Sequence, residues 1–263
     1  MLLECLFMLR FMSMQPQTPT VTAALIVIGN EVLSGRTRDA NLQFLATGLG
    51  AIGIQLRETR VIPDIEAEIV AAINDLGPKH DYVFTTGGIG PTHDDITSAA
   101  VAKAFDRPFG RNAEAEETLR AHYKPEDITE ARLSMADMPD NVTLIDNPVS
   151  RAPGFRIENV IVLPGVPRIM QAMFDGYKHN LSGGAEVKSI SITSAVQEGR
   201  AAKQLGELQE KYPDVEMGSY PFVRDGKVGT SLVARSGDLE RLEAAAEGIR
   251  DIIRSLGGEP MDD

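Results

Sequence analysis

Runs of apolar residues alternate with stretches of helical spacing along the first two thirds of the chain. Residues 24–28 form a continuous apolar run, which is typical of a strand buried on both faces. A helix is predicted to begin after Asp39, which serves as its N-cap, and to end at Gly53. Its predicted apolar face consists of Leu42, Leu45, Leu49 and Ile52.

The same alternation continues with two more strands and two more helices. The predicted strands are residues 54–62 and 81–86, and the predicted helices are residues 65–76 and 96–105. This alternation predicts an α/β fold with a mostly parallel sheet covered by helices on both faces. The loops 29–39 and 87–95 should then lie at the carboxyl edge of the sheet, where open α/β sheets bind ligands.

A hairpin and a second glycine-containing loop follow. Residues 113–138 are predicted to form one or two helices broken near Pro125, and residues 142–145 a short strand. Residues 154–157 and 160–163 predict a hairpin. Pro167, at the end of the next loop, suits the first position of a helix. That helix is expected to bury Met170, Met173, Phe174 and Tyr177.

A change of composition at residues 181–184 predicts a linker, which we expect to be sensitive to proteases. The strands predicted beyond it are residues 187–193, 215–217 and 227–234, and the helices are residues 200–212 and 239–256. The predicted organisation is a leader at 1–20, a core domain at 21–181 and a small α+β subdomain at 185–258.

Composition and charge exclude several classes of protein. The 263 residues have a formal net charge of −12 and include no tryptophan, which argues against general nucleic-acid binding. The single cysteine, Cys5, cannot form an internal disulfide, and no apolar run reaches the length of a membrane span. We therefore expect a cytoplasmic protein with a disordered leader and with neither a nucleic-acid nor a membrane partner.

The strongest local signal is the loop after the third predicted strand, which reads GGIGPTHDD over residues 87–95. Gly87, Gly88 and Gly90 allow a tight turn with exposed backbone N–H groups, and the helix that follows adds its dipole. Together they predict a site for a phosphate or carboxylate. The alternative is a turn between strand and helix that binds nothing.

Asp94 and Asp95 in this loop would repel a bound phosphate unless a cation lies between them. Mg²⁺ binds through one or two carboxylates together with substrate phosphates, so we predict Mg²⁺ or another divalent metal on Asp94 and Asp95. Asp95 also has a structural alternative, because Thr92 and Asp95 have the spacing of a capping box. Thr97 offers either a hydroxyl ligand or a cap.

Three further loops carry weaker signals. Glu31 follows the first strand directly, and Asn41 in the first turn of the next helix could face the same cleft. Asn147 begins a proline-containing loop, and Pro164 and Gly165 belong to the second glycine-containing loop. None of these loops identifies a site by itself.

Together these motifs resemble the MoaB/Mog (molybdopterin-binding) superfamily, in the branch shared by CinA amino-terminal domains and the molybdopterin-binding-like domain of FAD synthase. The matching segments are residues 29–35, 39–41, 86–97, 147–154 and 163–167. The resemblance implies a three-layer α/β/α core, a KH-like carboxy-terminal subdomain and a homo-oligomer, either a dimer or a trimer. It also implies a pocket for a pterin or nucleotide phosphate formed by Asp39, Asn41, Gly87, Gly88, Gly90, Thr92, Asp94, Asp95, Thr97, Asn147, Pro164 and Gly165.

The expected function is a divalent-metal-dependent nucleotide pyrophosphohydrolase of the ADP-ribose or FAD type. The alternative is a non-catalytic pterin- or nucleotide-binding protein linked to molybdenum cofactor metabolism. Asn30 stands where the family frequently has an acidic residue, which leaves one metal contact in doubt. We expect neither the deamidase activity of longer CinA proteins nor the FAD-forming activity of FAD synthase.

Overall fold

The computed structural model describes residues 20–224 and 226–263, so the predicted leader, apart from Thr20, lies outside the described residues. The described part of the chain separates into two compact units, which divide between Gly184 and Ala185. Every helix in the part of the chain that the structure describes is too short or too polar to cross a bilayer.

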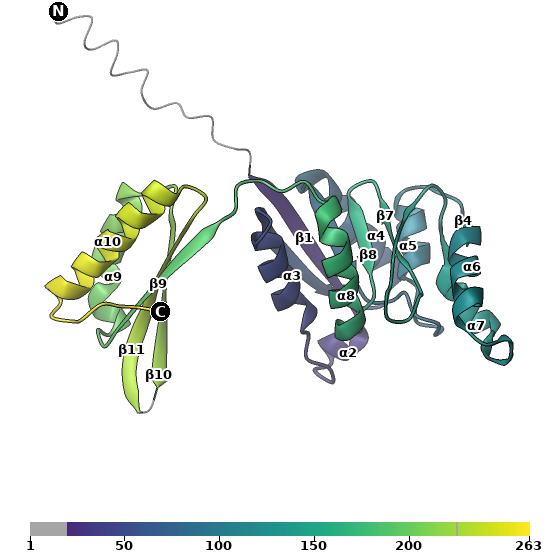
Figure 1. Cartoon of the computed structure of the whole chain (residues 1–263), viewed down its shortest axis with the longest axis horizontal. Coiled ribbons are helices and arrows are strands. Elements are labelled where there is room, and N and C mark those ends of the chain that lie inside the picture. The colour runs from purple at the N-terminus through teal and green to yellow at the C-terminus, as the bar shows by residue number, and fades with distance from the viewer. Residues whose placement is uncertain (1–19, 225) are drawn as a thin grey trace, which may run out of the picture. The chain divides into compact units, whose positions relative to one another are not determined.

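A six-stranded sheet forms the centre of the first unit (Figure 1). Its strands, in spatial order, are β2 (Ile54–Ile62), β1 (Val21–Ile28), β3 (Tyr82–Thr86), β8 (Val160–Leu163), β7 (Gly154–Ile157) and β6 (Thr143–Ile145). The pairs among β2, β1, β3 and β8 are parallel, whereas β7 pairs antiparallel with both of its neighbours. The mostly parallel sheet and the β7–β8 hairpin predicted from the sequence are confirmed.

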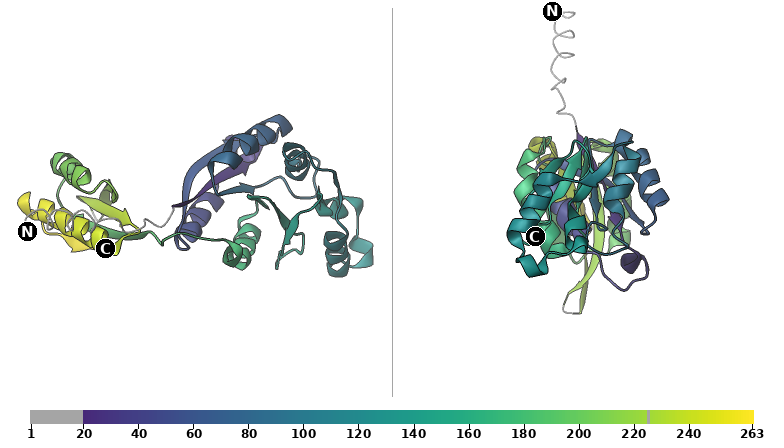
Figure 2. Two further views of the ribbon diagram at one scale, coloured as in Figure 1. Left: turned by 90° about the horizontal axis from the view of Figure 1, so that it is seen from above. Right: turned by 90° about the vertical axis from the view of Figure 1, so that its right-hand side faces the viewer.

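Helices cover both faces of this sheet, as Figure 2 shows from above. They are α2 (Asn30–Leu33), α3 (Asn41–Gly50), α4 (Glu66–Leu76), α5 (Thr97–Ala104) and α8 (Pro167–Tyr177). One hydrophobic core lies on the side of α4 and α5, and the other on the side of α3 and α8. Strand β1 contributes alternate residues to the two cores, which explains its unbroken apolar sequence. The expected three-layer α/β/α architecture is confirmed.

The register of the central strands brings the predicted loops to one edge. Val27 of β1 pairs with Thr86 of β3, and Thr86 pairs with Leu163 of β8. Because these strands are parallel, the segments that follow all three begin side by side at the carboxyl edge of the sheet.

An excursion between α5 and β6 contains more structure than the sequence pattern predicted. Its elements are β4 (Phe109–Arg111), α6 (Ala113–His122), η2 (Pro125–Asp127), α7 (Glu130–Leu133), η3 (Ser134–Ala136) and β5 (Asp137–Pro139). The prediction of one or two helices over residues 113–138 missed β5, which pairs with β4. Three-residue strands show no detectable alternation, so their pairing became visible only in the fold.

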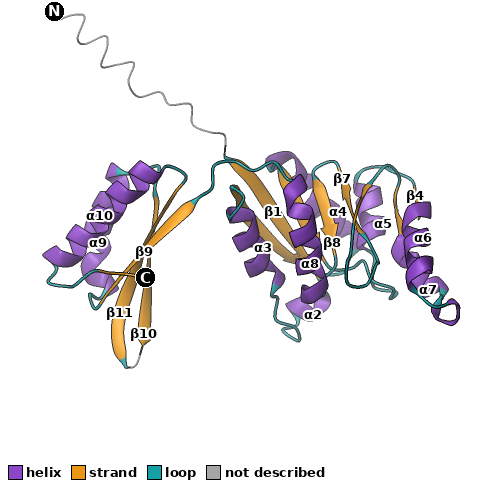
Figure 3. Cartoon of the chain, viewed as in Figure 1, coloured by secondary structure: helices purple, strands orange, loops and turns teal. Residues whose placement is uncertain are grey.

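The second unit is a four-stranded antiparallel sheet with two helices (Figure 3). Its elements in chain order are β9 (Lys188–Ser194), α9 (Glu198–Lys211), β10 (Glu216–Arg224), β11 (Lys227–Ser236), α10 (Leu239–Ser255) and β12 (Met261–Asp262). The α+β class is confirmed, and the order β-α-β-β-α-β is that of a split βαβ motif. Strand β10 is longer than predicted because Pro221, which normally interrupts strands, lies on an edge strand.

The predicted apolar face of α3 is partly wrong. Leu45 and Leu49 are fully buried, but Leu42 is 38% exposed and Asn41 is only 3% exposed. The N-cap position is Ala40, one residue later than predicted, but the Asp39 carboxylate does accept a hydrogen bond from the backbone N–H of Leu42 at 2.9 Å in the first turn. Helical spacing predicted Leu45 and Leu49 correctly but assigned Leu42 to the buried position that Asn41 occupies.

The predicted linker is packed against the first unit. The backbone N–H of Ser182 donates to the Tyr82 hydroxyl at 2.9 Å, and that of Gly184 donates to the carbonyl of Gly53 at 3.0 Å. A Cβ atom on Gly183 would lie 1.7 Å from the carbonyl oxygen of Ile52. These contacts hold residues 182–184 in place, so the segment should be less sensitive to proteases than its composition predicts. The remaining short helical turns are η1 (Gly77–Lys79) and η4 (Lys178–Asn180).

Gly183→Ala should destabilise the protein by about 1–3 kcal/mol, because the new methyl group meets backbone that cannot move aside easily. Gly176→Ala in α8 is the matched control, since a Cβ there meets nothing within 4 Å and alanine favours the helix. Urea unfolding of the full chain measures both. Equal midpoints for Gly183→Ala and wild type would contradict the packing of this segment.

Candidate functional site

A cavity of about 570 Å³ opens at the carboxyl edge of the six-stranded sheet. Its walls come from the segments after β1, β2, β3, β6 and β8, together with one residue of η3. The predicted convergence of the loops 29–39 and 87–95 is therefore present. The volume falls within the range of about 300–1,000 Å³ that is typical of small-molecule sites.

Two glycines of the loop after β3 have conformations that other residues rarely adopt. Gly87 has φ +110° and Gly88 has φ +68°, and the Gly87 N–H donates to the carbonyl of Leu163 at 3.1 Å. A Cβ on Gly87 would lie 2.1 Å from the Ile28 carbonyl oxygen. The loop is thus fixed against the two neighbouring strands, which aims its outer side at the cavity.

Thr97, the first residue of α5, lies directly behind Gly88. A Cβ on Gly88 would be 2.1 Å from the Thr97 hydroxyl oxygen, and the Thr97 N–H donates to the Gly88 carbonyl at 2.9 Å. Thr97 is fully buried and does not line the cavity. A larger residue at Gly88 would therefore collide with Thr97 of α5.

The two aspartates of the loop differ in their surroundings. The Asp95 carboxylate accepts hydrogen bonds from the backbone N–H of Thr92 at 2.8 Å and from the Thr92 hydroxyl at 2.5 Å. Thr92 and Asp95, which have the spacing of a capping box, therefore close a turn within the loop. They do not cap α5, which begins at Thr97. Asp94 is exposed, and the nearby Thr92 hydroxyl lowers the pKa of the Asp94 carboxyl below its ordinary value. Asp94 is therefore ionised at neutral pH and accessible from the cavity.

Two more carboxylates line the cavity from other loops. Glu31 in α2 was predicted, whereas Asp64 after β2 was assigned only to the start of a helix. In the fold, Asp64 accepts a hydrogen bond from the backbone N–H of Asn30 at 2.8 Å and so joins two loops. Among the described residues that line the cavity there is no lysine, arginine or histidine. The cavity is therefore strongly negative.

The loop after β8 forms another wall. Gly165 packs against the glycine loop, since its Cβ would lie 3.3 Å from the Cα of Gly87. The buried Asn41 side chain donates to the Gly165 carbonyl at 2.8 Å, so Asn41 holds this loop but does not line the cavity. Pro167 begins α8 as predicted.

Asn147 organises the loop after β6. Its side chain accepts from the backbone N–H groups of Val149 and Ser150, each at 3.0 Å, and donates to the Ala152 carbonyl at 2.8 Å. Its amide is 2% exposed and also donates to the Ser150 hydroxyl at 2.7 Å. Asn147 borders the cavity, but these internal bonds occupy its polar atoms, so its role is to shape the loop.

The predicted site residues divide into two groups. Those that line the cavity are Glu31, Gly87, Gly88, Gly90, Thr92, Asp94, Asp95, Asn147, Pro164 and Gly165. Asp39, Asn41 and Thr97 instead bind the first turn of a helix or support a loop from behind. The lining residues that sequence reasoning missed include Thr37, Asp64, Met135, Ser150, Val166 and Ile169. Only Asp64 carried a usable signal, because it follows a strand of the parallel sheet.

Residues 20–224 and 226–263 contain no group of three or more His, Cys, Asp or Glu side chains arranged to enclose a metal ion. Asp94 and Asp95 nevertheless fit a Mg²⁺ that takes one or two carboxylates from the protein and its remaining ligands from phosphates and water. Asp94 has the freer carboxylate of the two.

Comparisons with known proteins agree with this architecture. A family model described as a probable molybdopterin binding domain matches residues 24–182, and one described as the middle domain of FAD synthase matches residues 186–256. A protein of Pyrobaculum calidifontis is 38% identical over 211 residues, which are 76% of this chain and 80% of that protein.

A probable FAD synthase of Caenorhabditis elegans is 31% identical over 272 residues, 93% of this chain, although the match spans only 52% of that protein. The crystal structure of the protein CinA from Thermoplasma acidophilum, described as of unknown function, has a TM-score of 0.58 and 34% identity. It covers 62% of this chain and 99% of that one. This chain therefore belongs to the molybdopterin-binding-domain family, the MoaB/Mog superfamily that its loops resemble, in the CinA-like branch.

Proposed function

We propose that this protein is a divalent-metal-dependent hydrolase of nucleotide pyrophosphates of the ADP-ribose or FAD type. The observation that carries the proposal is the composition of the cavity wall. Two loops that lead into helices meet there with four carboxylates and, among the described lining residues, with no basic side chain.

The helix dipoles and the carboxylates at the cavity favour ligands of opposite charge. The amino ends of α5 and α8 attract anions through their helix dipoles. Asp94, Asp95, Glu31 and Asp64 repel anions and attract cations. A ligand that satisfies both demands is a phosphate that carries a divalent cation. The glycine loop that leads into α5 and Pro167, the first residue of α8, both line the cavity, which favours two linked phosphates over one.

The residues of the chain would bind and orient such a ligand. The loop from Gly87 to Gly90 offers backbone close to the ligand, and its attachment to β1 and α5 keeps that backbone rigid. Asp94 would hold the cation, and Asp95 would fix the turn that presents Asp94. When bound, a divalent cation neutralises phosphate charge and polarises the phosphorus–oxygen bonds.

The alternative is that the same cavity binds a pterin or nucleotide without turnover. The match to a probable molybdopterin binding domain favours this alternative. The match to an FAD synthase middle domain favours a flavin or adenine nucleotide. Because one fold supports both functions, only assays of turnover and binding separate them.

Asp94→Asn should lower Mg²⁺-dependent hydrolysis of ADP-ribose by at least about 10-fold while leaving the melting temperature unchanged, because Asp94 is exposed. The measurement is release of AMP from ADP-ribose at saturating Mg²⁺. Asp140→Asn, at an exposed aspartate outside the cavity, is the matched control and should behave as wild type. Full activity in Asp94→Asn would rule out a metal-binding role for Asp94.

Asp95→Ala should behave differently from Asp94→Asn. It removes the acceptor of two Thr92 hydrogen bonds, so it should destabilise the protein by about 0.5–2 kcal/mol in urea unfolding. If Asp95→Ala unfolds at the wild-type midpoint, the structural role of this carboxylate is wrong.

ADP-ribose should bind more tightly than AMP, and only when a divalent metal is present. Calorimetric titration of both ligands with Mg²⁺, and again with a chelator, measures the difference. The reason is that AMP can occupy one helix end only. Equal affinities for ADP-ribose and AMP, unchanged by the chelator, would contradict a pyrophosphate site and would indicate a metal-independent nucleotide or pterin pocket.

A further inference from the structure

Met135 lines the cavity from outside the βα loops, and different contacts hold it in place. Met135 lies in η3, within the excursion between α5 and β6, and lines the same cavity as Asp94. It is half-buried, whereas Leu133 and Ala136 on either side of it are 4% and 0% exposed. The buried neighbours anchor the segment in the core and leave the Met135 side chain free to border the cavity.

Hydrogen bonds to β4 and the residue after it also hold the segment around Met135 in place. The backbone N–H of Asn112 donates to the carbonyl of Ala136 at 2.9 Å, next to Met135. Arg111 of β4 then pairs with Asp137 of β5 in the two-stranded sheet. The position of Met135 therefore depends on how firmly β4 holds the end of η3.

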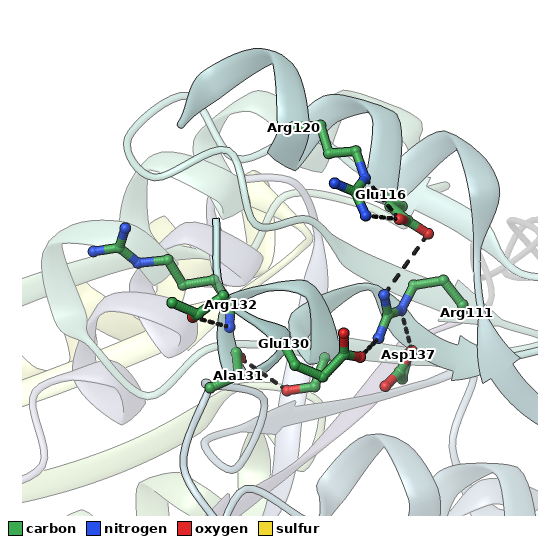
Figure 4. Close-up of polar contacts among 9 residues, drawn as sticks. Arg111, Glu116, Arg120, Glu130, Ala131, Arg132 and Asp137 are labelled. Carbon is green, nitrogen blue, oxygen red and sulfur yellow. Dashed lines mark hydrogen bonds and ion pairs between the residues drawn. The ribbon is translucent and has the colours of Figure 1, made fainter. Parts of the chain in front are cut away.

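Arg111 makes that attachment through its guanidinium group (Figure 4). Its Nε donates to Asp137 at 2.5 Å, one Nη lies 2.5 Å from a Glu130 oxygen, and the other lies 3.7 Å from a Glu116 oxygen. The hydrogen bond to Asp137 raises the pKa of Arg111 above its ordinary value. One side chain thus ties β5, α7 and α6 around the segment that carries Met135.

Met135 belongs to one of two apolar parts of the cavity wall; the other, with Val166, Pro167 and Ile169, lies in the loop after β8 and at the start of α8. Ile89 of the glycine loop and Ala152 after β6 line the cavity with Met135, and all three pack against the same hydrophobic core. An apolar surface of this kind offers a phosphate neither hydrogen-bond donors nor positive charge. Methionine is polarisable and packs favourably against flat aromatic rings.

We propose that Met135 is a specificity-determining residue that packs against the flat heterocyclic ring of the ligand, and that Arg111 is its positioning residue. The proposal rests on the proposed function and adds to it a binding surface for the aromatic ring of the ligand. The phosphates bind at the carboxylates and the glycine loop, and the base or pterin lies against Ile89, Met135 and Ala152. The ligand class is therefore a pyrophosphate that bears an aromatic heterocycle.

The test compares a ligand that has a ring with one that lacks it. Calorimetry with Mg²⁺ measures the affinities of the full-length chain for ADP-ribose and for inorganic pyrophosphate, and the readout is their ratio. Met135→Ala should lower the ratio of ADP-ribose to pyrophosphate affinity by about 3- to 10-fold, and Met135→Leu, which keeps the volume, by less than about 3-fold. Met217→Ala is the matched control, because Met217 is also half-buried against a core but lies in the other unit.

Arg111→Gln should lower the same ratio in a folded protein, as judged by a cooperative melt, whereas a purely structural role would weaken both ligands alike. An unchanged ratio in Met135→Ala overturns the proposal. A fall in the ratio with Val166→Ala instead, in the loop before α8, also overturns it, because the ring then lies against a different wall of the cavity. A wild-type protein that binds neither ligand with Mg²⁺ overturns the proposed function and this inference together.

Discussion

The electrostatic conflict within one cavity is the constraint on which the account depends. Parallel strands end side by side, so the loops that lead into the following helices meet at one cavity. That arrangement alone favours an anion. Four carboxylates from the same loops make the wall negative, and the described lining residues include no cation to balance them. A bound cation is the simplest way for such a wall to hold a phosphate.

A second layer of buried residues keeps the cavity in shape. Thr97 supports Gly88, Asn41 holds the carbonyl of Gly165, and Asn147 closes the loop after β6. Asn147 uses its polar atoms within its own loop, and Asn41 and Thr97 lie behind the cavity wall, where Asn41 Oδ1 and Thr97 Oγ1 are buried without a hydrogen-bond partner. Their contribution is rigidity, because a loop that is fixed to strands and helices can hold a ligand without being reordered on binding.

Much of the first unit could be predicted from the sequence, because its strands and helices are long enough to show their periods. The glycine loop, the Asp39 hydrogen bond to the first turn of α3, Pro167 at a helix start and the buried face of α8 all follow from local rules. Those rules do not reach contacts between distant segments. They missed Asp64, which faces the cavity only because β2 lies beside β1, and β5, which is too short to show a period.

Local sequence patterns also predicted the wrong structural role for several residues. Ser182, Gly183 and Gly184 have the composition of a flexible linker, yet they pack against Tyr82, Ile52 and Gly53. Asn41 has the residue type of a ligand-binding side chain, yet it is buried behind Gly165. In each case the decisive partner lies more than forty positions away, which no window along the sequence can show.

The most direct test of the central claim is whether metal and pyrophosphate bind to the cavity together. Electron paramagnetic resonance of Mn²⁺ in titrations of the purified protein, with and without a non-hydrolysable ADP-ribose analogue, measures the linkage. If the protein supplies one or two carboxylates to the ion, as proposed, Mn²⁺ should bind weakly alone and at least about 10-fold more tightly with the analogue. Equal Mn²⁺ affinity in both titrations would contradict the claim that the cavity holds its anion through a shared cation.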